Sequence, residues 1–154
     1  MKVGEICQHD VVATVTRASV SEVAKLMRDY HVGCVVVIDP PGSGIPVGVV
    51  TDRDIVVAVV APGLDPRTLS AGEIMSPDVV TATEDEDTAW AMKKLRDRGF
   101  RRLPVIDAEG QVCGIVSFDD LLQPASEAIS DIVQAIGIER VVEAHRRAPL
   151  NQSR

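Results

Sequence analysis

The sequence predicts a mixed α/β protein made of two pseudo-symmetric β-α-β-β-α units packed together, followed by a helical tail. Two observations lead to this fold class. A shift of 68 residues aligns residues 4–7 (GEIC) with residues 72–75 (GEIM), and a shift of 66 aligns residues 48–54 with residues 114–120. Each copy also shows the same order of apolar patterns, a helical one followed by two short β-branched runs.

The repeat sets the expected domain boundaries. We expect the first unit over residues 1–68, the second over residues 69–123 and the helical tail over residues 124–154. At 154 residues the chain has about the length of one domain, so we do not expect two independent hydrophobic cores. Two copies of one unit, each too small to bury its own faces, are expected to pack on each other.

The first helix of each unit is predicted by apolar spacing and by its capping residues. Residues 19–31 carry apolar side chains three and four positions apart, and Ser19 with Glu22 forms a capping box at the start. Asp87 occupies the cap position of the second copy, and Gly33 and Gly99 lie where the two helices are expected to stop. The apolar stripe of the second copy consists of Thr88, Ala91, Met92 and Leu95.

Short apolar runs after each of these helices predict buried strands, and a further helix follows them. That second helix is expected to begin at Thr51 in the first unit and at Ser117 in the second. The predicted strands are residues 35–38, 47–50, 103–106 and 112–116, with extended segments near residues 11–15 and 79–83.

Composition and charge restrict the possible partners and the compartment. The net charge of −7 repels polyanions, so neither nucleic acid nor anionic lipid is expected as a broad partner. The longest apolar run, residues 55–61, is far too short to span a membrane, and residues 1–10 lack an apolar signal segment. We therefore expect a cytoplasmic protein without a membrane partner. The three cysteines show no CxxC spacing and predict neither a disulfide framework nor a zinc site.

Two short motifs bear on function. Thr51 and Asp54 in GVVTDRD, and Ser117 and Asp120 in GIVSFDD, stand three residues apart where the second helices begin. Each pair can form a capping box, in which the hydroxyl and the carboxylate bond free backbone amides. The same geometry suits a ligand, because a helix N-terminus attracts phosphate and a carboxylate there can bond the hydroxyls of a ribose. The spacing alone leaves both interpretations open.

The repeated order, the GEI(C/M) segment, FRRLPVID and the paired GVVTDRD and GIVSFDD motifs resemble a tandem pair of CBS domains, the cystathionine β-synthase type module, in a stand-alone protein of bacterial type. The resemblance covers about residues 1–123. It implies that Thr51 and Ser117 lie near phosphate and that Asp54 and Asp120 hold the ribose of an adenosyl nucleotide. It also implies a homodimer and a regulatory ligand, AMP, ADP, ATP or S-adenosylmethionine, in place of a catalytic cofactor.

Further ligand contacts follow from the same resemblance. Arg101 and Arg102 precede a strand of the second unit, where a basic residue commonly faces the phosphates; the alternative is a solvated surface pair. The first unit has Gly33 and Cys34 at these positions, so its phosphate would take charge from Arg53 or from the other unit's arginines. The implied adenine pocket comprises Val12, Ala13 and Thr14 in one unit and Val80, Thr81 and Ala82 in the other.

An apolar stripe also lies outside the repeat. Ile129, Ile132, Val133 and Ile136 stand at helical spacing in the tail. Such a stripe must cover something, either the protein's own domain or another subunit.

The sequence thus predicts a regulatory protein without enzymatic activity that binds an adenosyl nucleotide in the cleft between its units and signals to a separate effector protein of unknown identity. The alternative is a structural or protein-interaction module in which both motifs only cap helices. An enzyme acting on adenylates is a third possibility. It is disfavoured because the sequence has no phosphate-binding glycine loop, no metal-ligand spacing and no nucleophile motif.

Overall fold

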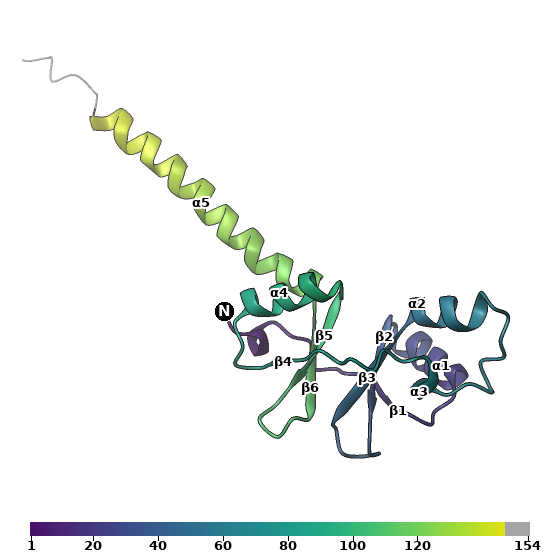
Figure 1. Ribbon diagram of the computed structural model, residues 1–154. Coiled ribbons are helices and arrows are strands. Elements are labelled where there is room, and N and C mark those ends of the chain that lie inside the picture. Colours follow the sequence, from purple (N-terminus) through teal and green to yellow (C-terminus); the bar gives the residue numbers. More distant parts are fainter. Residues whose placement is uncertain (147–154) are drawn as a thin grey trace, which may run out of the picture.

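The computed structural model describes the backbone of residues 1–146 and the side chains of residues 1–122, 126–136 and 138. The chain forms two units of the same topology, each a three-stranded sheet with helices, and a long final helix (Figure 1). The fold class predicted from the sequence, including the helical C-terminal segment, is confirmed.

The first unit contains a sheet in the order β1-β2-β3, in which β1 is parallel to β2 and β2 is antiparallel to β3. Ser19 caps α1 with its hydroxyl, and Glu22 completes the predicted capping box. The elements are β1 (Ala13–Val15), α1 (Val20–Tyr30), β2 (Cys34–Ile38), β3 (Pro46–Thr51), α2 (Asp52–Ile55) and a π-helical continuation, η2 (Val56–Val60).

The second unit repeats this arrangement with the sheet order β4-β5-β6. Asp87 caps α4, and Ala91 and Leu95 of the predicted stripe are buried, whereas Met92 is 40% exposed. The short helix α3 (Ala71–Ile74) precedes this unit, whose elements are β4 (Ala82–Thr83), α4 (Thr88–Arg98), β5 (Arg102–Ile106), β6 (Val112–Ser117) and α5 (Phe118–Arg146).

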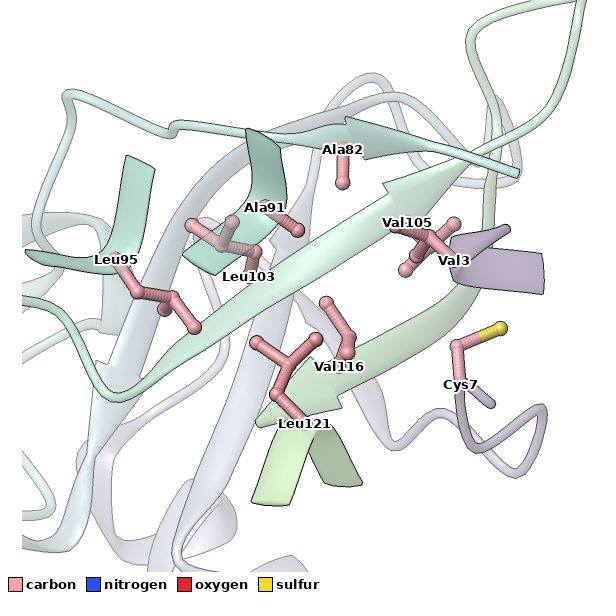
Figure 2. Close-up of a cluster of buried hydrophobic side chains, with 9 residues drawn as sticks. All are labelled: Val3, Cys7, Ala82, Ala91, Leu95, Leu103, Val105, Val116 and Leu121. Atoms are coloured by element: carbon pink, nitrogen blue, oxygen red, sulfur yellow. The ribbon is translucent and has the colours of Figure 1, made fainter. Parts of the chain in front are cut away.

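The segment that precedes the first unit packs on the second. A short 3-10 helix, η1 (Val3–Glu5), is held there because the Val3 amide donates to the Glu86 carbonyl (2.8 Å) and the Gly4 amide to the Glu84 carbonyl (2.9 Å). Figure 2 shows the resulting core, in which the side chains of Val3 and Cys7 lie among those of the second unit. Its other members are Ala82, Ala91, Leu95, Leu103, Val105, Val116 and Leu121.

The segment that precedes the second unit packs in turn on the first. Ala71 belongs to the core of the first unit, the Gly72 amide donates to the Thr16 carbonyl (2.8 Å), and the Ser76 amide donates to the Val49 carbonyl (3.0 Å). Each hydrophobic core therefore contains residues from both sides of residue 68, and the two units are interlocked.

Gly48 and Gly114, the first residues of the two repeated motifs, lie where the exchanged segments cross the sheets. A Cβ at Gly114 would come within 2.8 Å of the Cys7 Sγ and 3.2 Å of the Gln8 carbonyl oxygen, and one at Gly48 within 3.0 Å of the Ser76 carbonyl oxygen. The close approach of backbone to backbone thus requires glycine at both positions.

The two first helices end in different residues. His31, not Gly33, terminates α1 in the left-handed conformation with φ 55°, whereas Gly99 terminates α4 with φ 68°, as predicted. These residues are 68 positions apart and therefore equivalent in the repeat. The left-handed conformation costs a residue with a Cβ about 1–2 kcal/mol.

The final helix is continuous from Phe118 to Arg146 and passes the predicted boundary at residue 124 without a break. Its first turns pack on the second unit through the buried Leu121, and the remainder extends away from both units (Figure 1). Of the two alternatives for the apolar stripe of the tail, packing against its own domain is therefore excluded for Ile129, Ile132, Val133 and Ile136, which are all exposed.

Replacing His31 by glycine is expected to stabilise the protein. His31→Gly relieves the left-handed strain and should raise the free energy of unfolding by about 1 kcal/mol. Gly99→Ala, at the equivalent position, should lower it by a similar amount, although nothing lies within 4 Å of the added Cβ. Denaturant titration of both variants measures these changes, and equal stability of all three proteins would contradict the strain at His31.

The exchange of segments predicts that Val3 supports the second unit. Val3→Ala should lower the free energy of unfolding by about 2 kcal/mol, because Val3 is fully buried in that core. Val56→Ala provides the matched control, since Val56 is 55% exposed, and should change stability by less than about 0.5 kcal/mol. Equal losses in the two variants would show that η1 contributes nothing to the core.

Candidate functional site

Thr51 and Asp54 form a complete capping box at the start of α2. The Thr51 amide and the Thr51 hydroxyl both donate to the Asp54 Oδ2 at 2.8 Å, and the Asp54 amide donates to the Thr51 Oγ1 at 3.2 Å. Within the described part of the chain, no hydrogen bond uses the Asp54 Oδ1. One carboxylate oxygen therefore caps the helix, and the other can accept from a ligand.

Ser117 and Asp120 repeat this geometry at the start of α5, with one difference. The Ser117 amide (2.7 Å) and hydroxyl (2.6 Å) donate to the Asp120 Oδ2, and the Asp120 amide donates to the Ser117 Oγ (3.4 Å). Here the second carboxylate oxygen, Oδ1, accepts from the Gln8 side-chain amide at 3.3 Å. A ligand hydroxyl would have to compete with Gln8 for that oxygen.

Thr51 and Asp54 open onto a cavity of about 440 Å³ between the two units. The second unit contributes the turn from α4 into β5, which brings Phe100, Arg101 and Arg102 to the cavity. Three arginines (Arg53, Arg101, Arg102) and three aspartates (Asp52, Asp54, Asp78) line it, so positive and negative groups balance. Its volume lies within the range of small-molecule sites.

Ser117 and Asp120 open onto a smaller cavity of about 190 Å³, which the repeat relates to the first. Its turn comes from the first unit and consists of His31, Val32, Gly33 and Cys34, the equivalents of residues 99–102. Asp10, Asp119 and Asp120 line this cavity, and Arg102 is its one arginine. Negative charge therefore predominates here.

The arrangement pairs each motif with the turn of the other unit. Arg101 and Arg102 were expected first beside the motif of their own unit, but both line the cavity of Thr51 and Asp54 together with Arg53. Arg102 also reaches the cavity of Ser117 and Asp120, because it lies opposite Ser117 in the β5–β6 register. Phe100 and His31 were not predicted to line a cavity, and the repeat offset was the signal that could have identified them.

The residues expected around adenine are divided by the structure. Val12 lines the smaller cavity and Val80 the larger one. Ala13 and Thr14 lie in β1 and pair with β2, Ala82 is fully buried in the second core, and the Thr81 carbonyl accepts from the Lys94 ammonium (2.9 Å). These four residues are not among those that line either cavity.

Cys34 lies at the boundary between the two cavities and lines both. Burial raises the pKa of its thiol to about 11, although the Arg102 guanidinium lowers the pKa and thus acts in the opposite direction. Burial likewise raises the pKa of Cys113 to about 11. Both thiols are therefore protonated at neutral pH.

Two further observations concern the described residues as a whole. Within residues 1–146, the side chains that the structure describes include no group of three or more His, Cys, Asp or Glu arranged to hold a metal ion. No helix in this range has both the length and the apolar character needed to cross a bilayer.

Comparison with known proteins agrees with the repeat. A family model described as the CBS domain matches residues 3–61 and again residues 71–127. Protein MK0525 of Methanopyrus kandleri is 37% identical over 123 residues, a match that covers 80% of this chain and 62% of that protein. The chain thus corresponds to somewhat less than two thirds of this relative.

Two similar solved structures contain bound adenosyl compounds. The CBS domain pair of protein MJ0100, in complex with 5′-methylthioadenosine and S-adenosyl-L-methionine, has a TM-score of 0.72 and 25% identity over 83% of this chain and 98% of that one. The cytosolic domain of the Mg²⁺ channel MgtE, in complex with ATP, has a TM-score of 0.68 and 31% identity over 79% of this chain and 48% of that one.

The raised pKa of Cys34 predicts slow labelling of its thiol. At pH 8 a thiol of pKa about 11 should react about 100-fold more slowly than one at the ordinary value near 9, because only the thiolate reacts. Site-resolved mass spectrometry after maleimide treatment measures this rate, with the unfolded protein as the reference. The rate should rise with pH through pH 10, and fast labelling of folded Cys34 at pH 8 would contradict its burial.

Proposed function

This chain belongs to the CBS-domain family, with two CBS domains in tandem, and on that basis we propose that it is a regulatory module that binds an adenosyl nucleotide in the cavity of Thr51 and Asp54. It performs no reaction on the nucleotide. Its output is a change in the relative orientation of the two units, which a separate effector protein recognises.

One observation carries the choice of site. The capping box at Thr51 and Asp54 occupies only the Oδ2 of the carboxylate, and the Oδ1 has no hydrogen bond from the described residues. A carboxylate oxygen at a helix N-terminus is suited to accept from ribose hydroxyls, while the nearby amides and dipole favour phosphate. The equivalent oxygen of Asp120 already accepts from Gln8, and its cavity has less than half the volume.

The arginines of the larger cavity support a ligand with several phosphates, although three aspartates balance their charge. Arg53, Arg101 and Arg102 all line it, and guanidinium groups bind phosphate oxygens through paired, charge-assisted hydrogen bonds. S-adenosylmethionine carries a positively charged sulfonium, an ammonium and a single carboxylate in place of the phosphates, so it would gain less from these arginines. We therefore expect ADP or ATP to bind more tightly than S-adenosylmethionine.

Ligand binding would act on the arrangement of the units, because each cavity is lined by both. A nucleotide that contacts α2 of the first unit and the α4–β5 turn of the second stabilises the orientation in which both contacts form. The shift between orientations is limited to the difference in the ligand's affinity for them. Self-association as a homodimer would present this change to an effector on a larger surface.

A protein-interaction module that needs no ligand is the second candidate. It is favoured by the completeness of both capping boxes, which satisfy the backbone amides of Thr51 and Ser117 without any bound molecule. In that case the cavities are empty in the cell, and the motifs serve stability alone.

Isothermal titration with ATP, ADP, AMP and S-adenosylmethionine tests these alternatives. Asp54→Ala should weaken ATP binding at least about tenfold, because the ribose loses its charged acceptor. Asp120→Ala is the matched control, since it removes an equivalent capping box from the other cavity. Each variant should lose about 1 kcal/mol of stability, but only Asp54→Ala should lose affinity.

Arg101→Gln extends the test to the phosphates, because Arg101 lines only the larger cavity. This variant should bind ATP more weakly while AMP binding changes less. Loss of binding on Asp120→Ala instead of Asp54→Ala would move the site to the smaller cavity. Absence of binding by the folded wild-type protein to all four compounds would favour the interaction module.

A further inference from the structure

The second sheet contains a proline where the first sheet has a hydrogen-bond donor. Pro104 lies in β5, the central strand of the order β4-β5-β6, at the position equivalent to Val36 in β2. Proline has no amide hydrogen, so a central strand normally excludes it. Its presence here breaks a rule of sheet structure, and such breaks are expected at functional sites.

The missing amide has a defined partner. In the first unit the Val36 amide donates to the Val12 carbonyl at 3.0 Å. Val80 is the equivalent of Val12, and Pro104 cannot make this bond. Within the described part of the chain, no other group donates to the Val80 carbonyl. A strong acceptor is therefore left unpaired next to Pro104.

The pairing of the strands shows the same difference. β1 pairs with β2 at three positions, whereas β4 pairs with β5 at two. The absent pair would join Thr81 to Pro104. Its equivalent in the first sheet, Ala13 with Val36, is present. β4 is therefore one residue shorter than β1 at the end that follows Val80.

The second unit holds the released segment by a different contact. The Lys94 ammonium donates to the Thr81 carbonyl at 2.9 Å and to the Glu86 Oε2 at 2.7 Å. The equivalent of Lys94 in the first unit is Leu26, which can make neither bond. The segment is thus fixed from α4, while the Val80 carbonyl stays unpaired.

The unpaired carbonyl lies at the larger cavity. Val80 and Pro104 both line this cavity, whereas Val36 lines neither of the two. Val79 and Phe100 are also among its lining residues, and an aromatic ring stacks well on a base. An apolar wall with one carbonyl oxygen suits a flat heterocycle that carries a hydrogen-bond donor on its edge.

We propose that Pro104 is a specificity-determining residue, because it leaves the Val80 carbonyl free to accept from the 6-amino group of adenine. This inference rests on the proposed binding of a nucleotide in the larger cavity and adds a selection for the base. The 6-oxo group of hypoxanthine or guanine is an acceptor, so it would meet the carbonyl oxygen with no hydrogen between them. The smaller cavity lacks this selection, since the Val12 carbonyl already accepts from a backbone amide.

Calorimetric titration of the full chain with ATP and with purine riboside triphosphate tests the contact to the base. The two compounds differ only in the 6-amino group. Wild-type protein should bind ATP about tenfold more tightly, as expected for one hydrogen bond to an otherwise unpaired group. Pro104→Val supplies an amide as in the first unit, so the ratio of the two affinities should fall to about one.

Val36→Pro is the matched control, because it removes the equivalent amide from the first unit. The Val12 carbonyl that it releases lines only the smaller cavity, so the ratio should stay at about tenfold. Circular dichroism and thermal unfolding identify any variant that does not fold. The comparison of the two compounds on wild-type protein decides the question without either variant.

NMR observes the carbonyl directly and also needs no variant. Carbon-13 at the valine carbonyl and nitrogen-15 in threonine select the Val–Thr peptide bonds, which occur at residues 15–16, 50–51 and 80–81. ATP should move the carbonyl resonance of Val80 to lower field, whereas purine riboside triphosphate should not, because it has no donor at this position. Val15 is the reference, since its carbonyl already accepts from the Ala18 amide.

The outcomes distinguish this inference from the proposed function on which it rests. Three results would overturn the role of Pro104 alone. They are equal binding of the two compounds by wild-type protein, an unchanged Val80 resonance with ATP bound, and a folded Pro104→Val variant that keeps the tenfold ratio. Absence of ATP binding by the wild-type protein would overturn the role of Pro104 and the nucleotide site together.

Discussion

The structure depends on the reciprocal exchange of the segments that precede the two units. Val3 and Cys7 complete the core of the second unit, and Ala71 belongs to the core of the first. A unit of about 60 residues buries so little apolar surface that it would be only marginally stable by itself. Because each core includes residues from both repeats, neither unit can separate without exposing its core. The exchange thus keeps the units together and creates the two cavities between them.

Within this frame, one local motif serves two purposes. The capping box fixes the first turn of α2 or α5 through the Oδ2 of an aspartate, and this leaves the Oδ1 for another partner. The turn that faces it decides what that partner can be. Phe100, Arg101 and Arg102 give the larger cavity an apolar ring and positive charge, whereas Val32, Gly33 and Cys34 give the smaller cavity neither. Two cavities related by the repeat have therefore acquired different chemistry through a few turn residues.

The local periodicities predicted the helices and strands well because they depend on neighbouring residues. The repeat then showed that the same unit occurs twice. The capping boxes of Ser19, Thr51 and Ser117 could be predicted for the same reason, since spacing in a helix fixes which groups meet. The pairing of each motif with the turn of the opposite unit could not, because it arises only when the units pack. The range 19–31 predicted for the first helix agrees with α1, but its terminator was expected at Gly33, because glycine is the more common residue there. The left-handed conformation of His31 is visible only in φ.

The position of Arg102 links the two cavities physically. It lies opposite Ser117 in the second sheet, yet it lines the cavity of Thr51 and Asp54 as well. Anionic ligands in the two cavities would share the positive charge of this one guanidinium group. Like charges held a short distance apart on either side of it would also repel each other. The geometry therefore opposes simultaneous occupation by two polyphosphates, and it links the chemistry of the smaller cavity to the state of the larger one.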